Sequence, residues 1–253
     1  MPVRIDLNAD LGEGFGAWAG GDDEGLLGVI TSANVACGFH AGDPSIMRRV
    51  CEQAVERSVA IGAQVGYRDL AGFGRRRIEI DPDELTAEVL YQLGALDAFA
   101  RAAGDRVRYL KPHGALYHSA VQDAGQAGAI LTAVRLWPEP LPVLTLPGSR
   151  LAQLAAAAGL PWVAEAFADR AYRADGSLQP RTEAAAVLTD PDQIAPRARA
   201  LVDGGCIDTV TGEQIRIEAR SVCVHGDTPG ALRIARAVRE ALLAAGAELA
   251  RFA

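Results

Sequence analysis

The sequence predicts an α/β protein in which seven strand–helix units close, or nearly close, into a barrel. Two observations predict this fold: short apolar segments alternate with longer helical patterns, and polar residues recur directly after the apolar segments. Such alternation is typical of stacked β-α units with a parallel sheet. With 253 residues and no linker or repeat, we expect one barrel domain over residues 1–253. A doubly wound open sheet is the alternative, because strand order cannot be read from sequence.

The elements follow one another regularly along the chain. The predicted strands occupy residues 4–7, 33–37, 59–63, 107–110, 142–146, 162–166 and 222–224. The clearest predicted helix covers residues 83–103, where one apolar stripe recurs at helical spacing. Four helix starts are predicted where a capping residue precedes proline, at Asp43, Asp81, Asp190 and Thr228. Residues 207–218 interrupt the alternation, and the segment DTVTGE predicts a small turn or hairpin there.

Composition excludes several classes of protein. The net charge of −7 and the pI of about 5.2 argue against a nucleic-acid binder. The one dense basic run, Arg75 to Arg77, is interpreted as a solvated loop. No apolar run approaches the roughly 18 residues of a membrane span, and the chain opens on strand-like sequence, so we expect neither a membrane partner nor a signal region. Four cysteines without CxxC spacing favour reduced thiols and a cytoplasmic location.

The first strand carries three polar residues on one face. Asp6, Asn8 and Asp10 alternate with apolar residues, and a strand points alternate side chains the same way. Burying two carboxylates and an amide is costly unless they have partners or a function. A hydrogen-bonded structural network or a helix cap is the alternative. Because sites of parallel barrels lie at the carboxyl ends of the strands, Asp10 is predicted to be functional.

The second strand ends in a similar pattern. Asn34 and His40 share parity, and glycines flank the histidine where a ligand could approach. Asp43 has a simpler interpretation as the cap of the next helix. Cys37 is interpreted as a small buried hydrophobe, since no paired base is evident for a nucleophile.

The fourth and sixth strands add charged residues. Lys111 and His113 lie two apart, so both can face one cavity, and an unpaired buried lysine is rarely structural. Glu165 and Asp169 share parity on the sixth strand. Arg170 and Arg181 are predicted either to clamp a carboxylate or phosphate or to pair with these acids.

The last strand ends in His225 and Asp227, the latter again a possible helix cap. His40, His113 and His225 therefore each follow a predicted strand and stand beside glycine. Any one could be a structural histidine, but three in equivalent places indicate a site. His118 is expected to be peripheral. The glycine-rich segment 12–21 either cradles phosphate or only turns the chain, and it matches no complete nucleotide-binding motif.

Five ordered motifs together resemble the LamB/YcsF family, which supplies one subunit (the A subunit) of the prokaryotic ATP-dependent 5-oxoprolinase. They are DLNADLGE at residue 6, SANVACGFHAGD at 32, KPHGALY at 111, EAFADR at 165 with ADGSLQPR at 174, and VHGD at 224. The resemblance covers nearly the whole chain. It implies a distorted, TIM-like (β/α)7 barrel related to the glycoside hydrolase/deacetylase folds.

One residue departs from the family pattern. Where the family usually has Gly-Ala-His-Pro after the third strand, this chain has Gly62, Ala63, Gln64 and Val65. Glutamine cannot titrate as a base and is a poorer metal ligand than imidazole. If that histidine is essential, we expect altered activity or another substrate; if it only binds substrate by a hydrogen bond, glutamine can replace it.

The resemblance implies an ATP-dependent cyclic amide hydrolase that opens the lactam of 5-oxo-L-proline to L-glutamate, with ATP cleaved to ADP and phosphate. It also implies two partner subunits, which could bind the ATP. The residues hypothesised to be catalytic are Asp10, His40, Lys111, His113, Glu165 and His225. The residues hypothesised to bind substrate are Asp6, Asn8, Glu13, Asn34, Gln64, Asp169, Arg170, Arg181 and Asp227.

Within this hypothesis, Lys111, Arg170 and Arg181 bind anions, Asp10 or Glu165 orients or deprotonates water, and His113 or His225 transfers protons. No metal ligand is assigned. The main rival is a metal-dependent, deacetylase-like hydrolase, in which Asp10, His40 and His113 hold a divalent ion, an interpretation that Gln64 weakens. The second rival is a non-catalytic role in which the barrel only binds the substrate.

Overall fold

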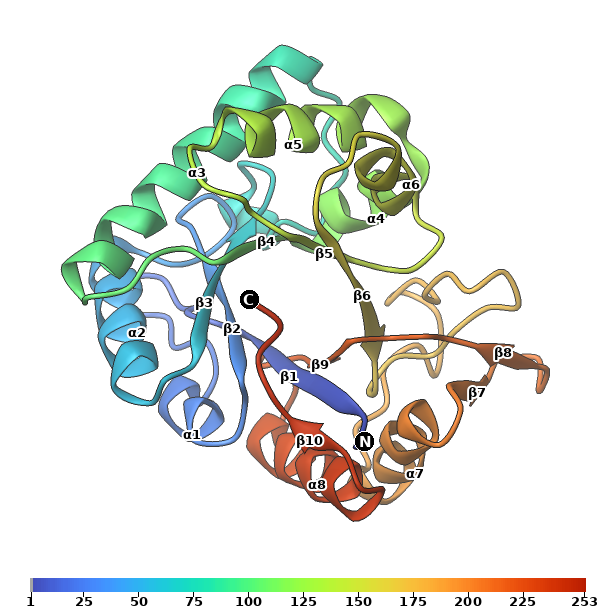
Figure 1. Cartoon of the computed structure of the whole chain (residues 1–253). Helices are drawn as coiled ribbons and strands as arrows, with labels where there is room; N and C mark the ends of the chain where they lie inside the picture. Colours follow the sequence, from blue (N-terminus) through green and yellow to red (C-terminus); the bar gives the residue numbers. More distant parts are fainter. Residues whose placement is uncertain (1) are drawn as a thin grey trace.

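Seven parallel strands form a closed barrel with helices around its outside (Figure 1). A computed structural model describes residues 2–253. The barrel strands are β1 (Arg4–Leu11), β2 (Ser32–Ala36), β3 (Ala60–Val65), β4 (Tyr109–Pro112), β5 (Val143–Thr145), β6 (Trp162–Phe167) and β9 (Ser221–Val224). Because β9 pairs with both β6 and β1, the sheet closes on itself. The predicted barrel of seven β-α units is confirmed, and the open sheet is wrong.

Helices connect successive strands and cover the outside of the barrel (Figure 1). They are α1 (Asp23–Leu27), α2 (Pro44–Glu56), α3 (Pro82–Ala102), α4 (Gly114–Gln122), α5 (Ala124–Leu136), α6 (Arg150–Ala157), α7 (Pro191–Val202) and α8 (Ala231–Ala244), with a short 3-10 helix, η1 (Leu70–Gly72). The described helices do not include one that is long and apolar enough to cross a membrane.

Three of the four predicted helix starts are confirmed. The side chains of Asp43, Asp81 and Asp190 accept backbone N–H bonds at the starts of α2, α3 and α7. The prediction at Thr228 is wrong, because α8 begins only after Gly230. Gly230 adopts a left-handed conformation with φ 79°, which places a turn between Pro229 and the helix.

The polar residues of β1 point into the barrel, and its apolar residues point outward to the surrounding helices. On β1, Ile5 and Leu7 belong to the core between barrel and helices. The alternate residues Asp6, Asn8 and Asp10 are buried and bond to residues of other barrel strands. Successive side chains of a strand point to opposite faces, so one strand supplies both the outer core and the polar interior.

The carboxyl terminus closes one end of this interior. A separate apolar cluster contains Ala60, Tyr109, Leu144 and Val163, packed against Phe252 and Ala253. Figure 1 shows the chain end over the middle of the barrel, after β10 (Glu248–Leu249) has paired with β1. The Tyr109 ring packs over Gly62, where any side chain would collide with it.

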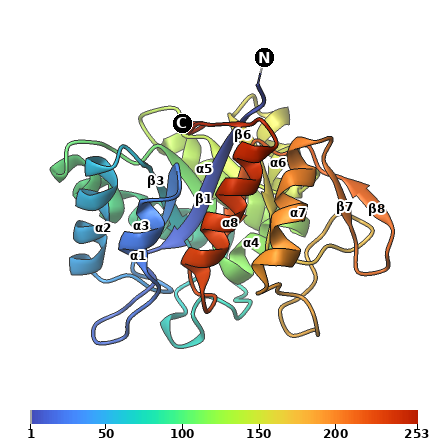
Figure 2. The same ribbon diagram turned by 90° about the horizontal axis from the view of Figure 1, so that it is seen from below.

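Both termini lie at one end of the barrel and the long loops at the other (Figure 2). The loops after β1, β3 and β6 extend from the end where these strands finish. The hairpin predicted before the last strand is confirmed as β7 (Cys206–Asp208) and β8 (Gln214–Arg216), which pair antiparallel. A functional site is therefore expected at the loop end of the barrel.

Candidate functional site

A cavity of about 490 Å³ opens among the loops at the carboxyl ends of the barrel strands. Its polar and charged lining includes Asp10, Arg75, Arg77, Lys111, His113, Tyr117, His118, Asp123, Arg170, Arg173, Ser177, Arg181 and His225. Of the predicted site residues, the cavity is thus lined by Asp10, Lys111, His113, Arg170, Arg181 and His225. The others lie behind them or at the rim.

Lys111, the only lysine in the chain, is surrounded by acceptors. Its Nζ lies 2.7 Å from Glu165 Oε1, 3.3 Å from Asp10 Oδ1, 3.2 Å from Asn8 Oδ1 and 3.1 Å from Cys223 Sγ. Burial alone would lower the pKa of Lys111, but its carboxylate partners outweigh burial and the pKa lies well above its usual value. Because an ammonium has only three N–H bonds, Lys111 is already saturated and neutralises the site acids rather than offering a free donor.

The two acids beside Lys111 differ in environment. Burial raises the pKa of Asp10, but Lys111, His225 and Asn34 together hold it below its ordinary value. Burial dominates for Glu165 and raises its pKa despite Lys111. Glu165 has no exposed surface and also accepts the hydroxyl of Tyr117 at 3.0 Å, whereas Asp10 reaches the cavity. Of the two acids predicted to act on water, Asp10 is therefore the one that faces the cavity.

Asp169 supports His225 from behind. Asp169 accepts the backbone N–H of His225 and its ring Nδ1, all at 3.0 Å. Burial raises the pKa of Asp169, but His225 more than offsets this and the pKa lies below its usual value. An ionised carboxylate only accepts, so Nδ1 carries the proton and Nε2 remains a free acceptor beside the cavity. Asp169 thus orients His225 rather than lining the cavity.

A second group joins His40, His113, Glu13 and Gln64. The two imidazoles stack with centroids 3.9 Å apart. The Gln64 amide donates to Glu13 Oε1 and its carbonyl accepts from His40 Nε2, each at 3.1 Å. His113 Nε2 lies 3.4 Å from the same Glu13 oxygen. Burial lowers the pKa of His40 to about 4 and that of His113 well below its ordinary value, so both rings are neutral at pH 7. Only His113 lines the cavity.

The remaining inner residues form a layer below the site. Asn34 donates to Asn8 at 2.7 Å and to Asp10 at 2.8 Å, and it accepts from Tyr109. Asp6 accepts from Ser32, Thr31 and Ser221. Burial raises the pKa of Asp6 to about 6. The alternative of a hydrogen-bonded structural network therefore describes Asp6, Asn8 and Asn34 better than contact with substrate.

Arginines surround the mouth of the cavity. Asp227 pairs with Arg75, and its Oδ2 lies 3.6 Å from Arg181 Nη1. The helix-cap interpretation of Asp227 is wrong, because α8 begins at Ala231 without a side-chain cap. Arg75 to Arg77 lie in an exposed loop, as predicted, but Arg75 also lines the cavity and pairs with Asp227 in the loop after β9. Sequence offered no comparable signal for Arg75, because it lies ten residues after the end of β3, whereas His113 and His225 directly follow their strands.

Three further residues belong to the site although the sequence patterns did not single them out. His118 lines the cavity and is not peripheral as expected. Tyr117 donates its hydroxyl to Glu165, and Cys223 Sγ accepts from the Lys111 ammonium. Cys223 lies two residues before His225 on the same face of β9, a parity signal that could have found it. Cys37 is buried with a raised thiol pKa, consistent with its interpretation as a small hydrophobe.

The glycine-rich loop after β1 turns the chain. Phe15 and Trp18 form a β-bridge, and a side chain at Gly14 would come within 2.8 Å of the Trp18 carbonyl oxygen. A side chain at Gly20 would collide with the backbone of Gly14. The glycines are thus required by backbone packing, and the loop contributes nothing to the cavity lining.

Two groups of three potential metal ligands lie in the described barrel: Glu13 with His40 and His113, and Asp10 with Cys223 and His225. The predicted set of Asp10, His40 and His113 is therefore split between them. A ligated metal lies in the plane of each imidazole, and two rings only 15° from parallel do not share such a point nearby. In the second group the Lys111 ammonium already contacts two of the three ligands, Asp10 and Cys223, and its positive charge repels a cation there. The residues as placed do not fit a resident metal.

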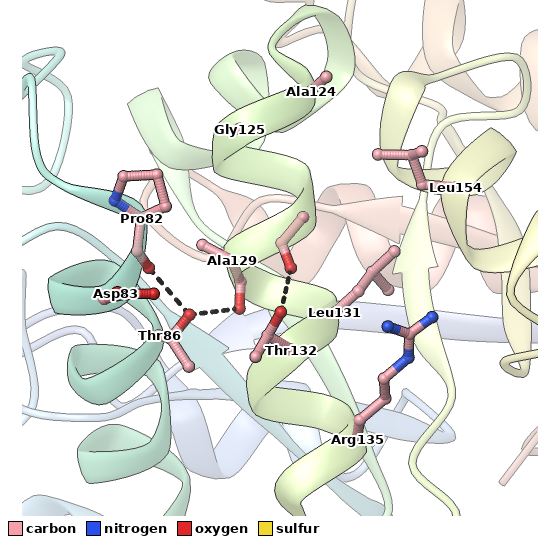
Figure 3. A pocket seen from close by; sticks show the side chains of 11 residues that line it. Pro82, Asp83, Thr86, Ala124, Gly125, Ala129, Leu131, Thr132, Arg135 and Leu154 are labelled. Atoms are coloured by element: carbon pink, nitrogen blue, oxygen red, sulfur yellow. Dashed lines mark hydrogen bonds between the residues drawn. The ribbon is translucent and has the colours of Figure 1, made fainter.

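A second hollow of about 330 Å³ lies outside the barrel, between α3, α5 and α6 (Figure 3). Its hydroxyls are already bonded: Thr86 donates to helix carbonyls at 2.9 and 3.1 Å, and Thr132 to Gly128. Among the described residues that line this hollow, only Asp83 and Arg135 are charged, whereas the barrel cavity brings together three histidines, several arginines and Asp10, so the barrel cavity is the candidate active site.

Residues 5–253 match the LamB/YcsF family, as the five motifs predicted. The chain belongs to the LamB/YcsF family. It is 63% identical over 249 residues to the 5-oxoprolinase A subunit of Streptomyces avermitilis, covering 98% of this chain and 100% of that protein. It is 58% identical over 252 residues to the 5-oxoprolinase A subunit of Mycobacterium ulcerans, covering all of both chains.

Solved structures agree with this membership. The lactam utilization protein of Thermus thermophilus superposes with a TM-score of 0.93 at 44% identity, covering 99% of this LamB/YcsF chain and 100% of that chain. A family 4 carbohydrate esterase from Streptomyces lividans superposes with a TM-score of 0.50 at 12% identity, over 99% and 93% of the two chains. This second likeness concerns the fold alone and confirms the expected deacetylase-like barrel.

Proposed function

We propose that this chain is the A subunit of a 5-oxoprolinase, which hydrolyses the lactam of 5-oxo-L-proline to L-glutamate. The full-length likeness to proteins named as 5-oxoprolinase A subunits and to a lactam utilization protein supports this assignment. The observation that carries it is the pair of His225 and Asp169, with a free imidazole Nε2 at a cavity that Asp10 also lines. An oriented base beside an ionised acid is what hydrolysis of an amide needs.

The chemistry assigns each group a task. His225 Nε2 takes a proton from the attacking water and passes it to the ring nitrogen as the carbon–nitrogen bond breaks. The Asp10 carboxylate orients that water. Asp169 holds the imidazole in the required tautomer. His113, which lines the cavity with a lowered pKa, is the second group able to accept a proton there.

Three residues predicted to be catalytic, Glu165, Lys111 and His40, receive positioning roles in this proposal. Glu165 does not reach the cavity, and it fixes the Lys111 ammonium at 2.7 Å. Lys111 keeps Asp10 ionised rather than binding an anion. His40 likewise supports His113 by stacking on it, while Gln64 fixes the His40 tautomer by accepting its Nε2–H. Anion binding therefore falls to Arg170 and Arg181, with Arg75 added.

An unstrained lactam resists water because amide resonance is lost in the attack. Transfer of the ATP γ-phosphoryl group to its carbonyl oxygen releases ADP and makes the carbon electrophilic. Attack by one water with cleavage of the carbon–nitrogen bond then leaves an acyl phosphate, and a second water hydrolyses this to glutamate and inorganic phosphate. The chain has no complete phosphate-binding loop motif, which favours ATP binding by two partner subunits. The complex is then a cytoplasmic, ATP-dependent cyclic amide hydrolase, and the whole chain acts in it as one barrel.

The test is release of glutamate from 5-oxoproline and ATP by the two partner subunits, with this chain present or absent. We expect glutamate only when all components and ATP are present. An H225Q variant should then abolish glutamate release. Binding of 5-oxoproline without turnover by the full complex would instead favour the non-catalytic role, and glutamate release without this chain would overturn the proposal.

A further inference from the structure

Arg170 is a buried guanidinium that lacks a carboxylate partner. It is 2% exposed, and within residues 2–253 none of the ion pairs includes it. Its Nε donates to the Ala186 carbonyl at 3.1 Å and one terminal nitrogen donates to the Gln179 carbonyl at 2.5 Å. These bonds hold the loop after β6, and the positive charge is offset only in part, by the neighbouring Asp169 carboxylate, which also holds His225. Burying such a charge is costly unless an anion joins it.

Arg75 and Arg181 share a single carboxylate. Arg75 comes from the loop after β3, Arg181 from the loop after β6, and Asp227 from the loop after β9. All three side chains are partly exposed, between 24% and 35%, at the mouth of the cavity. Two cations facing one anion leave one positive charge in excess at the point where three loops meet.

The other arginines of the cavity are compensated. Arg77 pairs with Glu79 at 2.9 Å and Arg173 pairs with Glu183 at 2.6 Å. The excess positive charge is therefore concentrated on Arg75, Arg170 and Arg181, which all line the same cavity. The pKa of Arg170 is lowered to about 10, chiefly by burial and in addition by the nearby positive charges of Arg181 and Arg75.

We propose that Arg75, Arg170 and Arg181 form a subsite for an oxyanion, a phosphoryl or carboxylate group, and that Asp227 fills part of this subsite until the ligand arrives. The planar guanidinium fork matches either anion and binds it in a bidentate manner. The incoming anion takes over Arg75 and Arg181, and Asp227 is released toward solvent. The Asp227 carboxylate thus competes with the ligand and sets its affinity.

This subsite rests on the proposed function only for the identity of its natural ligand. In a 5-oxoprolinase it would receive the substrate carboxylate or the phosphoryl group of an activated lactam. Anion binding itself is a property of the isolated chain and needs neither partners nor turnover. A failure of the binding test would therefore leave the glutamate assay, and with it the proposed function, untouched.

The test measures binding of inorganic phosphate and of acetate to the purified full-length chain, by calorimetry and by the anion-dependent rise in Tm at constant ionic strength. A D227N variant removes the competing charge with little change of shape. We expect it to bind the preferred anion about tenfold more tightly than the original chain. The anion that gains more in D227N identifies the ligand as phosphoryl or carboxylate.

Matched variants exclude a general charge effect. R75M and R181M should each weaken binding at least about tenfold, while R173M, which removes a compensated arginine of the same cavity, should leave it within about twofold. The arginine variants are chosen at partly exposed positions, so folding is preserved and is checked by circular dichroism. Unchanged or weaker binding by D227N, or equal losses in R75M and R173M, would overturn the subsite.

Discussion

The carboxylate of Asp169 holds His225 at two points, the ring Nδ1 and the backbone N–H, with contacts of 3.0 Å. One buried acid thus fixes both the position of the strand end and the tautomer of the imidazole. The geometry leaves Nε2 as the acceptor at the cavity. In the proposed mechanism, this pair is where proton transfer takes place.

We predict that D169N lowers kcat for glutamate release by about 100-fold or more, with little change in KM. The asparagine amide can donate to Nδ1 and so favour the wrong tautomer. The measurement is steady-state glutamate formation by the complete complex. The matched control is D175N, which alters an exposed acid of the same loop that bonds only to Ser177. A D169N variant with unaltered kcat would remove the pair from the mechanism.

Replacing Lys111 should destabilise the fold strongly. K111M leaves Asp10 and Glu165 buried together without a counter-charge, and breaking such a buried pair costs about 3–5 kcal/mol. Urea denaturation measures the loss. As a control, R48M removes an exposed helical pair with Glu52, which is worth about 0.3–0.5 kcal/mol. Equal free energies of unfolding for the two variants would show that Lys111 does not stabilise the buried Asp10 and Glu165 carboxylates.

The Gln64 position tests whether a hydrogen bond or a titrating group is needed there. Q64L leaves Glu13 and His40 without their shared partner, and we expect a loss of about 1–3 kcal/mol in the free energy of unfolding. Q64H, the residue usual in the family, should retain glutamate release because an imidazole can still donate to Glu13. If Q64L were as stable as the original chain, the hydrogen bonds that link Glu13, Gln64 and His40 would not contribute to stability.

The buried Asp6 predicts a pH-dependent stability. Its pKa is raised to about 6 in the fold from 3.8, so the folded state binds a proton more tightly than the unfolded chain. The contribution of Asp6 is thus fully present below about pH 4 and is lost as the pH rises toward 6. The loss is about 3 kcal/mol at most. The free energy of unfolding of the original chain minus that of D6N should fall between about pH 4 and pH 6; a difference that rises would contradict the shift.

Metal removal should leave the protein intact. The histidine rings at the Glu13 group are nearly parallel, and the Lys111 ammonium contacts Asp10 and Cys223 of the other group. We expect the chain to keep its Tm, and the complex its glutamate release, after the chain is dialysed against a chelator. Magnesium is then restored for ATP. Tight stoichiometric zinc in the purified chain, with loss of Tm on its removal, would revive the metal-dependent hydrolase.

Sequence predicted most of the barrel because each strand repeats one simple pattern. The alternation of Asp6, Asn8 and Asp10 with apolar neighbours determined both the strand and its polar inner face. The aspartate–proline pairs located three helix starts. The helix start predicted at Thr228 is wrong for a local reason. Gly230 adopts a left-handed conformation, so α8 begins only at Ala231, and the Thr228-Pro229 pair does not indicate this.

For the site, sequence determined which side chains lie near one another but not which of them face the cavity. Strand parity placed Asp10, Lys111, His113, Glu165 and His225 in one interior. Parity could not reveal that Lys111 is saturated by its neighbours, that Glu165 lies beneath it, or that Asp169 stands behind His225.

Those distinctions, and the pairing of Arg75 and Arg181 with Asp227, depend on residues separated by tens to more than a hundred positions in the chain. Local sequence sets the alternation of a strand and the cap of a helix, because both act over a few residues. Closure of the barrel alone decides which loops meet and which charges pair, and therefore which groups remain free for a ligand.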